Sequence, residues 1–286
     1  MTITSDAAET ADTSGSKSSG GQSALSPLRS PWQVTKAVWY ALILREIQTR
    51  FWSRRFGAFW VLAEPILHVL IMVLIFSFIR SDSITSVPFA LWLVLGIVPF
   101  FMMREIVFGT LGAVKGNKAL FTYRQVKPFD TYVARAILQV MVYTTVLILL
   151  VGAMAFLFGY PIPIYRPIEL LAVFGVMVAL AFGLGILFSL LVQALPDVEP
   201  IVRLLFFPLY LLSGVIFPLS FIPAKYLEYL LWNPFLHLID LFRQFSLAGY
   251  SPIAGTNLTY PAEFALVLLF FGLFIYRERQ YDLVTD

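Results

Sequence analysis

Long apolar runs, separated by short polar gaps, dominate the chain from Phe56 to Tyr276. Backbone in hydrocarbon must satisfy its own hydrogen bonds, so an apolar run of about 20 residues predicts a spanning helix. The pattern predicts an all-α membrane protein with six transmembrane helices per subunit, whose transmembrane domain covers residues 56–280. The predicted spans are residues 56–79, 87–114, 130–165, 167–194, 201–217 and 258–276.

The segment between the fifth and sixth predicted spans is broken into shorter pieces. Residues 218–258 contain apolar stretches about half the length of a span, such as Tyr229–Ile239, interrupted by Pro and Gly. Stretches of about 10–14 apolar residues are more typical of re-entrant or interfacial helices than of spanning ones. We therefore predict short re-entrant helices in this segment.

The segment before the first span has a helical period. Tyr40, Ile43, Leu44, Ile47 and Phe51 recur at helical spacing and form one apolar stripe. This predicts an amphipathic helix over residues 31–55, lying on the cytoplasmic face. The pattern leaves open whether this helix only anchors the first span or also contacts a cytoplasmic partner. The charged candidates for such contacts are Arg45, Glu46, Arg50, Arg54 and Arg55.

The two ends of the chain differ from this apolar body. Residues 1–30 are rich in Ser and Thr and poor in apolar residues, which predicts a disordered tail and no secretory signal. Residues 281–286 are predicted to form a short cytoplasmic C-terminal tail.

Composition and charge fix the environment and the orientation. Hydrophobic residues make up 59% of the chain and charged residues 13%, more apolar surface than a soluble domain of this size can bury. Cysteine is absent, which excludes disulfides and thiolate metal sites. With both termini cytoplasmic, the inner segments hold fifteen Lys and Arg and the outer segments four. The positive-inside rule therefore predicts a multi-pass protein with both termini in the cytoplasm.

Several kinds of catalytic or cofactor site have no counterpart in the sequence. No G-x-x-x-x-G-K-[ST] motif occurs, no metal-ligand spacing is found, and the two histidines, His68 and His237, stand alone. We predict no enzyme activity, no metal, no cofactor bound by this chain, and no nucleic-acid partner.

Two ionisable residues lie at similar depth in consecutive predicted spans. Glu64 and Arg104 are each about eight residues, or ~12 Å, from the cytoplasmic end of their helices. Because charges at membrane depth need partners, this predicts a Glu64–Arg104 ion pair. The pair is expected to fix helix register; direct contact with a substrate is the alternative.

Aromatic side chains are abundant, at 16% of residues. Most are expected to pack or to face lipid. If the bundle encloses a path for a substrate, aromatic rings could line it, and five residues of the second and fifth spans are candidates. These are Trp92, Phe100, Phe206, Phe207 and Tyr210.

The loop between the second and third spans is basic and compact. Gly116-Asn117 and Lys127-Pro128 bracket a piece, residues 118–126, that can form a short helix. Such a helix could transmit movement from a partner into both spans, although inner loops are basic for topology alone. The candidate coupling residues are Lys115, Asn117, Lys118, Tyr123, Arg124, Gln125 and Lys127.

Several segments together resemble one family. They are Leu44–Phe51, Phe56–Trp60 with Glu64-Pro65, Tyr123–Pro128, Ser213–Pro218 and Asn233–His237. In their order and spacing they resemble the membrane subunit of ABC-2 type (type V) exporters, most closely the permeases of Gram-negative capsular polysaccharide exporters, the KpsM type. The resemblance covers roughly residues 34–280.

The resemblance implies a bacterial inner-membrane homodimer that works with a separate dimeric ATPase, which binds ATP and Mg. The coupling loop would contact that ATPase, and the re-entrant helices would lie at the outer face. The substrate would be a lipid-linked capsular polysaccharide, passed on to periplasmic co-polymerase and outer-membrane components. The polar residues expected at the outer face are Asn233, His237, Asp240 and Arg243.

Other functions stay open at this point. The exporter could move another cell-surface polymer, such as O-antigen or teichoic acid, or a small lipophile. A membrane-embedded glycosyltransferase would need clustered acidic or His residues at a membrane edge, and the outer loops hold only scattered ones. A secondary transporter usually carries an internal repeat, and none is convincing here.

Overall fold

The computed structural model describes residues 30–51, 57–79, 87–219 and 222–280, and the secondary structure within these ranges is helical, without strands. The expected tails, 1–30 and 281–286, lie outside the described residues except for Ser30. The candidates Arg54 and Arg55 also lie outside them, as does the side chain of Arg50. The prediction of an all-α protein is confirmed.

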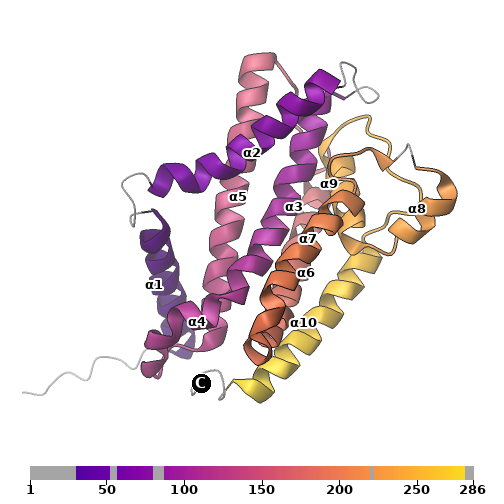
Figure 1. Ribbon diagram of the computed structural model, residues 1–286. Helices are drawn as coiled ribbons and strands as arrows, with labels where there is room; N and C mark the ends of the chain where they lie inside the picture. Colours follow the sequence, from indigo (N-terminus) through magenta and orange to yellow (C-terminus); the bar gives the residue numbers. More distant parts are fainter. Residues whose placement is uncertain (1–29, 52–56, 80–86, 220–221, 281–286) are drawn as a thin grey trace, which may run out of the picture.

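Five helices of the described residues are long and apolar enough to cross a membrane, and they match five of the six predicted spans. They are α2 (Gly57–Ile79), α3 (Phe89–Leu111), α5 (Pro128–Phe158), α6 (Pro167–Ala194) and α10 (Thr259–Arg279). Figure 1 shows α3 and α5 running side by side, with α10 more inclined and α2 crossing them obliquely.

The span predicted over residues 201–217 is a shorter helix, α7 (Glu199–Leu212), which follows the 3-10 turn η2 (Pro196–Val198). Its 14 residues measure about 21 Å, less than the ~30 Å hydrocarbon core. The helix stops because Gly214 adopts a left-handed conformation, with φ 66°. A sixth crossing therefore depends on the residues after α7 and stays a prediction.

Helix α3 lies at the centre of the subunit. It packs against α2, α5, α6, α7 and α9, and most of its side chains are buried, including those at Trp92, Phe100 and Ile106. Helix α10 packs mainly on α6 at the side of this group. Most faces of α3 therefore contribute to the core, while Arg104 and Glu105 stay partly exposed.

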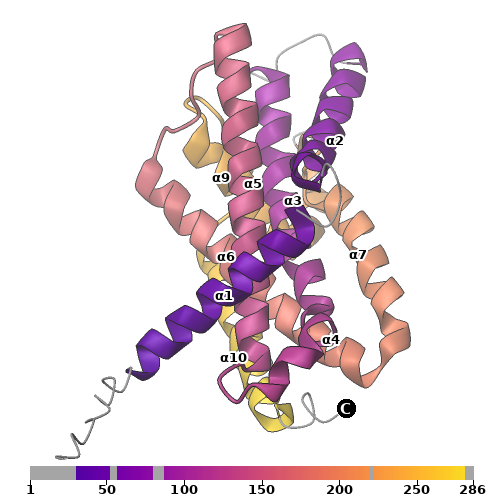
Figure 2. The same ribbon diagram turned by 90° about the vertical axis from the view of Figure 1, so that its left-hand side faces the viewer.

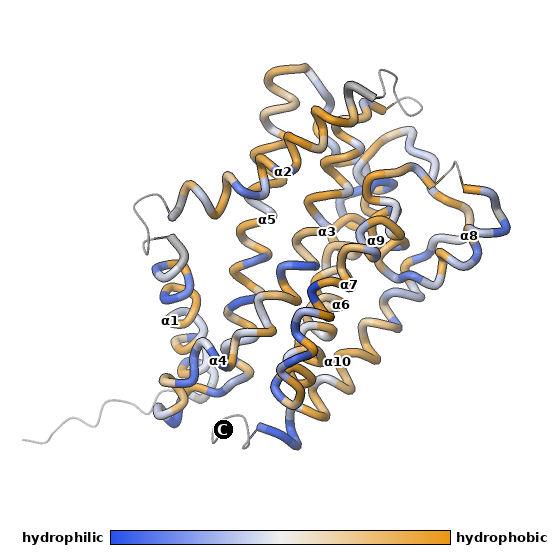
Figure 3. The backbone as a smooth tube through the Cα atoms, viewed as in Figure 1, coloured by the Kyte–Doolittle hydropathy of each residue, from blue (hydrophilic) through white to orange (hydrophobic). Residues whose placement is uncertain are grey.

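The two ends of the bundle carry different short helices. At one end lie α1 (Pro31–Phe51), α4 (Ala113–Asn117) and the 3-10 turn η1 (Lys118–Thr122), together with the end of α10 (Figure 1). At the other end lie α8 (Ala224–Leu230) and α9 (Pro234–Ser246). In place of the one short helix expected over residues 118–126, the structure has α4 followed directly by η1, which ends at Thr122. Figure 3 shows hydrophilic residues gathered near α1, α4 and the end of α10.

Helix α1 lies against α5 (Figure 2). Leu42 and Glu46, one turn apart, are buried, whereas Tyr40 and Leu44 of the predicted apolar stripe are exposed. The side of α1 that faces the subunit is therefore mixed, because Ile47 of the predicted stripe also packs against the core. The predicted apolar stripe is divided between the subunit and the exposed side of the helix.

Candidate functional site at the junction of α1, α4 and α5

A buried carboxylate joins α1 to α5. Arg135 of α5 donates its Nε hydrogen to Glu46 Oε1 at 2.9 Å, and its Nη1 group donates to the Gly109 carbonyl of α3 at 3.0 Å. The two side chains are 17% and 11% exposed, so the pair is largely buried and keeps only limited contact with water. Removing one partner of such a pair leaves an uncompensated charge, which is far more costly than losing a surface salt bridge.

The amide of Asn117 adds α4 to the same network. Its Nδ2 group donates to Glu46 Oε1 at 3.3 Å and to the Ala113 carbonyl at 2.8 Å, and its Oδ1 accepts a hydrogen bond from Arg45. An amide is suited to this position because it donates and accepts at once. We name Arg45, Glu46, Asn117 and Arg135 the polar junction; it ties α1, α3, α4 and α5 together.

A second link runs beside the polar junction. Trp39 of α1 donates its indole N–H to Asp130 Oδ1 at 2.7 Å, while Asp130 Oδ2 accepts from the backbone N–H of Lys127 at 2.9 Å. Asp130 is the third residue of α5 and reaches back to the capping residue, Lys127, rather than capping the helix itself. The start of α5 is therefore fixed to α1 as well.

The other predicted coupling residues lie on the exposed side of the polar junction. Tyr123 is 65% exposed, and five more candidates extend into solvent: Lys115, Lys118, Arg124, Gln125 and Lys127. Of the predicted coupling set, Asn117 alone is buried. The structure thus separates the set into one structural residue and an exposed basic rim.

A groove of about 410 Å³ opens between α1 and residues of η1 and the segment that follows it. Val38, Ala41 and Leu42 form one wall, and Leu120 and Val126 lie opposite. Arg45 of the polar junction and the exposed Tyr123 and Gln125 also line it. The groove thus brings apolar and polar groups of α1 and of the predicted coupling loop onto one surface.

At the opposite end, Arg243 of α9 is buried among backbone carbonyls. Its guanidinium donates to the carbonyls of Trp92, Gly214 and Val215 at 3.1, 2.8 and 2.8 Å. It also stacks 3.5 Å from the Trp92 ring centre, and a Cβ on Gly96 would overlap it. Burial lowers the pKa of Arg243 to about 10, which leaves it charged at neutral pH. The guanidinium thus binds the carbonyls at the point where the chain leaves the helical conformation after α7.

Asp240, one turn before Arg243, holds the segment that follows α9. Its carboxylate accepts hydrogen bonds from Tyr250 Oη at 2.7 Å, from the backbone N–H of Ile253 at 3.0 Å and from Thr256 Oγ1 at 3.0 Å. Burial and the adjacent Asp240 carboxylate raise the pKa of Tyr250.

The other two predicted outer-face residues also make local structural contacts. Asn233 accepts from the Phe235 N–H, capping α9, and donates to Ser213 Oγ at 2.9 Å. His237 lies 2.8 Å from the Leu231 carbonyl through Nε2, and its Nδ1 accepts from the Asn257 N–H at 3.1 Å. Together the four residues fasten α9 to the segments before and after it.

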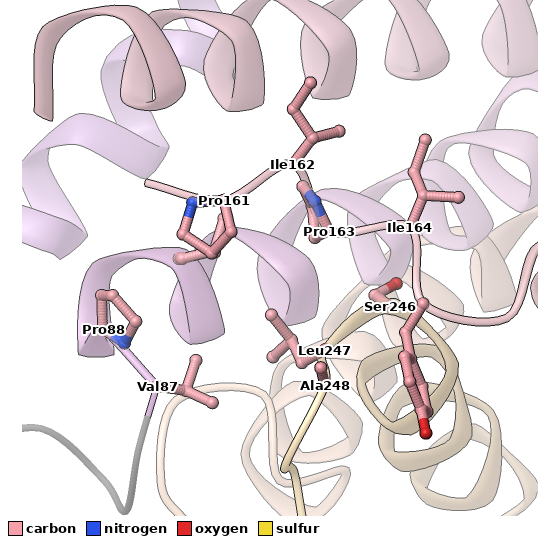
Figure 4. A pocket seen from close by; sticks show the side chains of 11 residues that line it. Val87, Pro88, Pro161, Ile162, Pro163, Ile164, Ser246, Leu247 and Ala248 are labelled. Atoms are coloured by element: carbon pink, nitrogen blue, oxygen red, sulfur yellow. The ribbon is translucent and has the colours of Figure 1, made fainter. Parts of the chain in front are cut away.

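A cavity of about 170 Å³ lies at this same end, between the start of α3, the α5–α6 connection and the end of α9 (Figure 4). Its lining is mainly apolar, with Pro161 on the side opposite Leu247. It brings no charged group together and lies at the end opposite the polar junction.

The predicted Glu64–Arg104 ion pair is wrong for this structure. Arg104 pairs with its neighbour Glu105 at 2.9 Å, and Glu64 is exposed, with no ion pair to any described residue. Equal depth does not bring two side chains together unless both also point into the same interface.

The five aromatic residues predicted to line a path differ in their exposure. Trp92, Phe100, Phe206 and Tyr210 are buried in the subunit core, so in this conformation they present almost no surface to a substrate. Phe207, in contrast, is 65% exposed on α7. The four buried rings act as packing residues here.

The sequence interpretation missed Arg135, Trp39 and Asp130 as site residues. Arg135 was counted only as an inner cation, although a charge inside the third span already indicated that it needs a partner. Its pairing with Glu46, 89 residues away, has no local sequence signal.

Comparison with known proteins identifies the family. Residues 37–246 match the ABC-2 type transporter family. The chain is 38% identical over 258 residues to the polysialic acid transport protein KpsM of Escherichia coli, an alignment that covers 90% of this chain and 99% of that protein. It is 30% identical over 236 residues to the capsule polysaccharide export inner-membrane protein CtrC of Neisseria meningitidis serogroup B, covering 82% and 87%.

A third relative, the capsule polysaccharide export inner-membrane protein BexB of Haemophilus influenzae, is 27% identical over 233 residues, covering 82% of this chain and 87% of that protein. The resemblance stated from the sequence motifs is confirmed. With a family match over most of its length and a relative aligned almost end to end, this chain belongs to the ABC-2 type transporter family as a membrane-embedded transport subunit.

Proposed function

We propose that this chain is the permease of an ABC exporter that moves a lipid-linked capsular polysaccharide across the bacterial inner membrane. The observation that carries the proposal is the alignment over 99% of a polysialic acid transport protein at 38% identity. Two further relatives named for capsule polysaccharide export support the same substrate class.

The chain works as a homodimer with both termini in the cytoplasm. The cations near α1, α4 and the end of α10 support this orientation through the positive-inside rule. Helix α7, extended by residues 213–217, supplies the sixth crossing, and α8 and α9 form the re-entrant unit at the outer face. Periplasmic and outer-membrane components receive the polymer there.

Energy comes from a separate ATPase dimer, which binds ATP and Mg, and this chain itself carries no enzyme activity. The ATPase contacts the exposed rim formed by α4, η1 and residues 123–127. The polar junction supports this role because it joins the rim to α1, α3 and α5 through shielded hydrogen bonds. A displacement of the rim therefore moves these helices together rather than bending the loop alone.

A gene disruption in the source bacterium tests the function. Cells without the chain are expected to accumulate polysaccharide in the cytoplasm and to lose it from the surface, and the intact gene restores surface polymer. Immunofluorescence on intact and permeabilised cells measures both pools. Unchanged surface polysaccharide in the disrupted strain contradicts the proposal.

Purification tests whether ATP hydrolysis belongs to the separate ATPase subunit. The chain isolated alone is expected to hydrolyse no ATP, whereas its complex with the ATPase subunit does, and the complex is expected to contain two copies of each. ATP hydrolysis by the chain without a companion subunit contradicts this part of the proposal.

A further inference from the structure

Two partly exposed ion pairs lie on neighbouring helices within the bundle. On α3, Arg104 pairs with Glu105 at 2.9 Å, with side chains 30% and 26% exposed. On α7, Arg203 pairs with Glu199 at 2.8 Å, with side chains 46% and 40% exposed. Helix α7 runs alongside α3, so the two pairs belong to one region of the subunit (Figure 1).

Both guanidinium groups gather around one aromatic ring. The Cζ atom of Arg104 lies 5.8 Å and that of Arg203 4.9 Å from the ring centre of Phe108. Arg104 also lies 4.1 Å from the ring centre of Phe101. A guanidinium near an aromatic face still has in-plane N–H groups that can bind an oxyanion. We name Arg104, Phe108 and Arg203 the arginine strip.

Each guanidinium retains free hydrogen-bonding capacity. Arg104 uses Nε and Nη2 on Glu105, and Arg203 uses Nε and Nη2 on Glu199. Within the described residues, neither Nη1 group has an acceptor. The carboxylates balance the charge of the strip, which favours weak and reversible binding of a further anion over tight capture.

The depth of the strip argues against a lipid-facing role. Arg104 lies seven residues before the end of α3, about 10 Å along the helix axis. A charged side chain facing hydrocarbon is costly, so partly exposed charges at this depth are found at protein interfaces or water-filled paths. The face formed by α3 and α7 therefore meets water or protein.

Unpaired polar atoms lie beside the strip. His68 Nε2 and Tyr210 Oη are buried and have no hydrogen-bond partner among the described residues. Both rings pack on Phe101, the ring that also carries Arg104, at centroid distances of 4.7 and 5.6 Å. A buried polar atom without a partner costs about 1–3 kcal/mol, and a polar ligand or water entering here would reduce that cost.

We infer that the arginine strip binds the acidic groups of the transported molecule, carboxylate or phosphate, as it passes the α4-side half of the subunit. This inference rests on the proposed function. Arg203 lies one turn into α7 and meets an anion first; Arg104 lies deeper on α3. Phe207, one turn beyond Arg203 and 65% exposed, offers a sugar ring a stacking surface on the same helix.

The test uses the full chain with its ATPase subunit in lipid vesicles. Stimulation of ATP hydrolysis is measured against an acidic oligosaccharide and against the same oligosaccharide with its carboxyl groups reduced. A third arm replaces phosphatidylcholine by a phosphate-bearing anionic lipid, without glycan. The variants are Arg104→Gln and Arg203→Gln, and Arg166→Gln, an exposed arginine outside the strip, is the matched control.

We expect each strip variant to raise the half-stimulating concentration of the acidic oligosaccharide roughly tenfold, as for the loss of one charge-assisted contact. The reduced oligosaccharide and the Arg166 variant should show no change. A loss confined to the phosphate-lipid arm assigns the strip to the lipid anchor and supports anion binding there. Unchanged responses of both strip variants in every arm overturn the inference.

Two further measurements keep the result interpretable. The double variant Arg104→Gln with Glu105→Gln removes the pair without leaving a lone charge, so it tests binding if the single variant does not fold. Absence of polymer export and of any glycan response in the wild-type complex contradicts the proposed function instead. The phosphate-lipid arm then still decides whether the strip binds anions.

Discussion

The two ends of the subunit each bury an arginine, but they satisfy it differently. Arg135 at the polar junction binds the Glu46 carboxylate of α1 and the Gly109 carbonyl of α3. Arg243 binds three backbone carbonyls and stacks on Trp92, with no carboxylate in its hydrogen bonds. One arginine joins separate helices through a carboxylate of one and a backbone carbonyl of another. The other fixes backbone that has left the helical conformation.

Removing Arg243 should have the largest effect. Arg243→Met leaves three carbonyls without their donor and removes the contact with Trp92, at a cost of at least about 3 kcal/mol. We expect the variant to aggregate or to melt well below the wild type in a detergent thermal-unfolding assay. Arg166→Met is the control and should melt like the wild type. An unchanged melting temperature for Arg243→Met would show that water replaces the guanidinium.

Breaking the polar junction should lower stability less than the loss of Arg243 does, but it should lower polymer export more. Glu46→Ala leaves Arg135 without its carboxylate, at about 2 kcal/mol because the pair keeps some contact with water. We expect the ATPase to hydrolyse ATP at its basal rate while polymer export falls at least tenfold. A double-mutant cycle with Arg135→Met should give a coupling energy of about 1–3 kcal/mol. Additive effects of the two substitutions would argue against the network.

Asn117 offers a finer test of the same region. Asn117→Ala removes the hydrogen bonds to Arg45, Glu46 and the Ala113 carbonyl, for a cost of about 1–2 kcal/mol and a partial loss of export. The neighbouring Lys118→Ala, at an exposed position, should change stability by less than about 0.5 kcal/mol. Equal effects of the two substitutions on stability would contradict the separation into a buried core and an exposed rim.

The smallest expected effect concerns Tyr250. Its pKa lies above the ordinary value of 10.0, so the neutral phenol stabilises the folded state fully below pH 10, and this contribution is lost as the pH rises further. Tyr250→Phe loses the hydrogen bond to Asp240, about 1 kcal/mol at neutral pH, but its melting temperature should fall less steeply above pH 10. Parallel pH profiles for variant and wild type would exclude this ionisation as a stability factor.

The long helices could be predicted from the sequence because length and hydropathy alone determine whether a segment can cross a bilayer. The prediction was weakest at residues 201–217, where Pro208 and Gly214 act on the backbone and helix α7 ends at Leu212. The pattern predicted a span over the whole segment, because hydropathy does not reveal where a helix stops.

The functional residues were harder to predict, for a geometric reason. Hydropathy gives depth along a helix but not the direction in which a side chain points. Arg104 has the expected depth, yet its closest carboxylate is its own neighbour Glu105. Likewise, Trp92 and Phe100 are buried because α3 is central, and a central helix has the same apolar composition as a lipid-facing one.

The orientation of α1 has a consequence for how export responds to its surroundings. Because Glu46 and Arg45 are committed to contacts within the subunit, we expect the exposed Tyr40 and Leu44 to contact the phospholipid headgroups and the first acyl carbons. Such contacts would connect the membrane surface to α5 through this helix. Headgroup size and acyl-chain order should alter the export rate even when nucleotide supply and subunit composition are held constant.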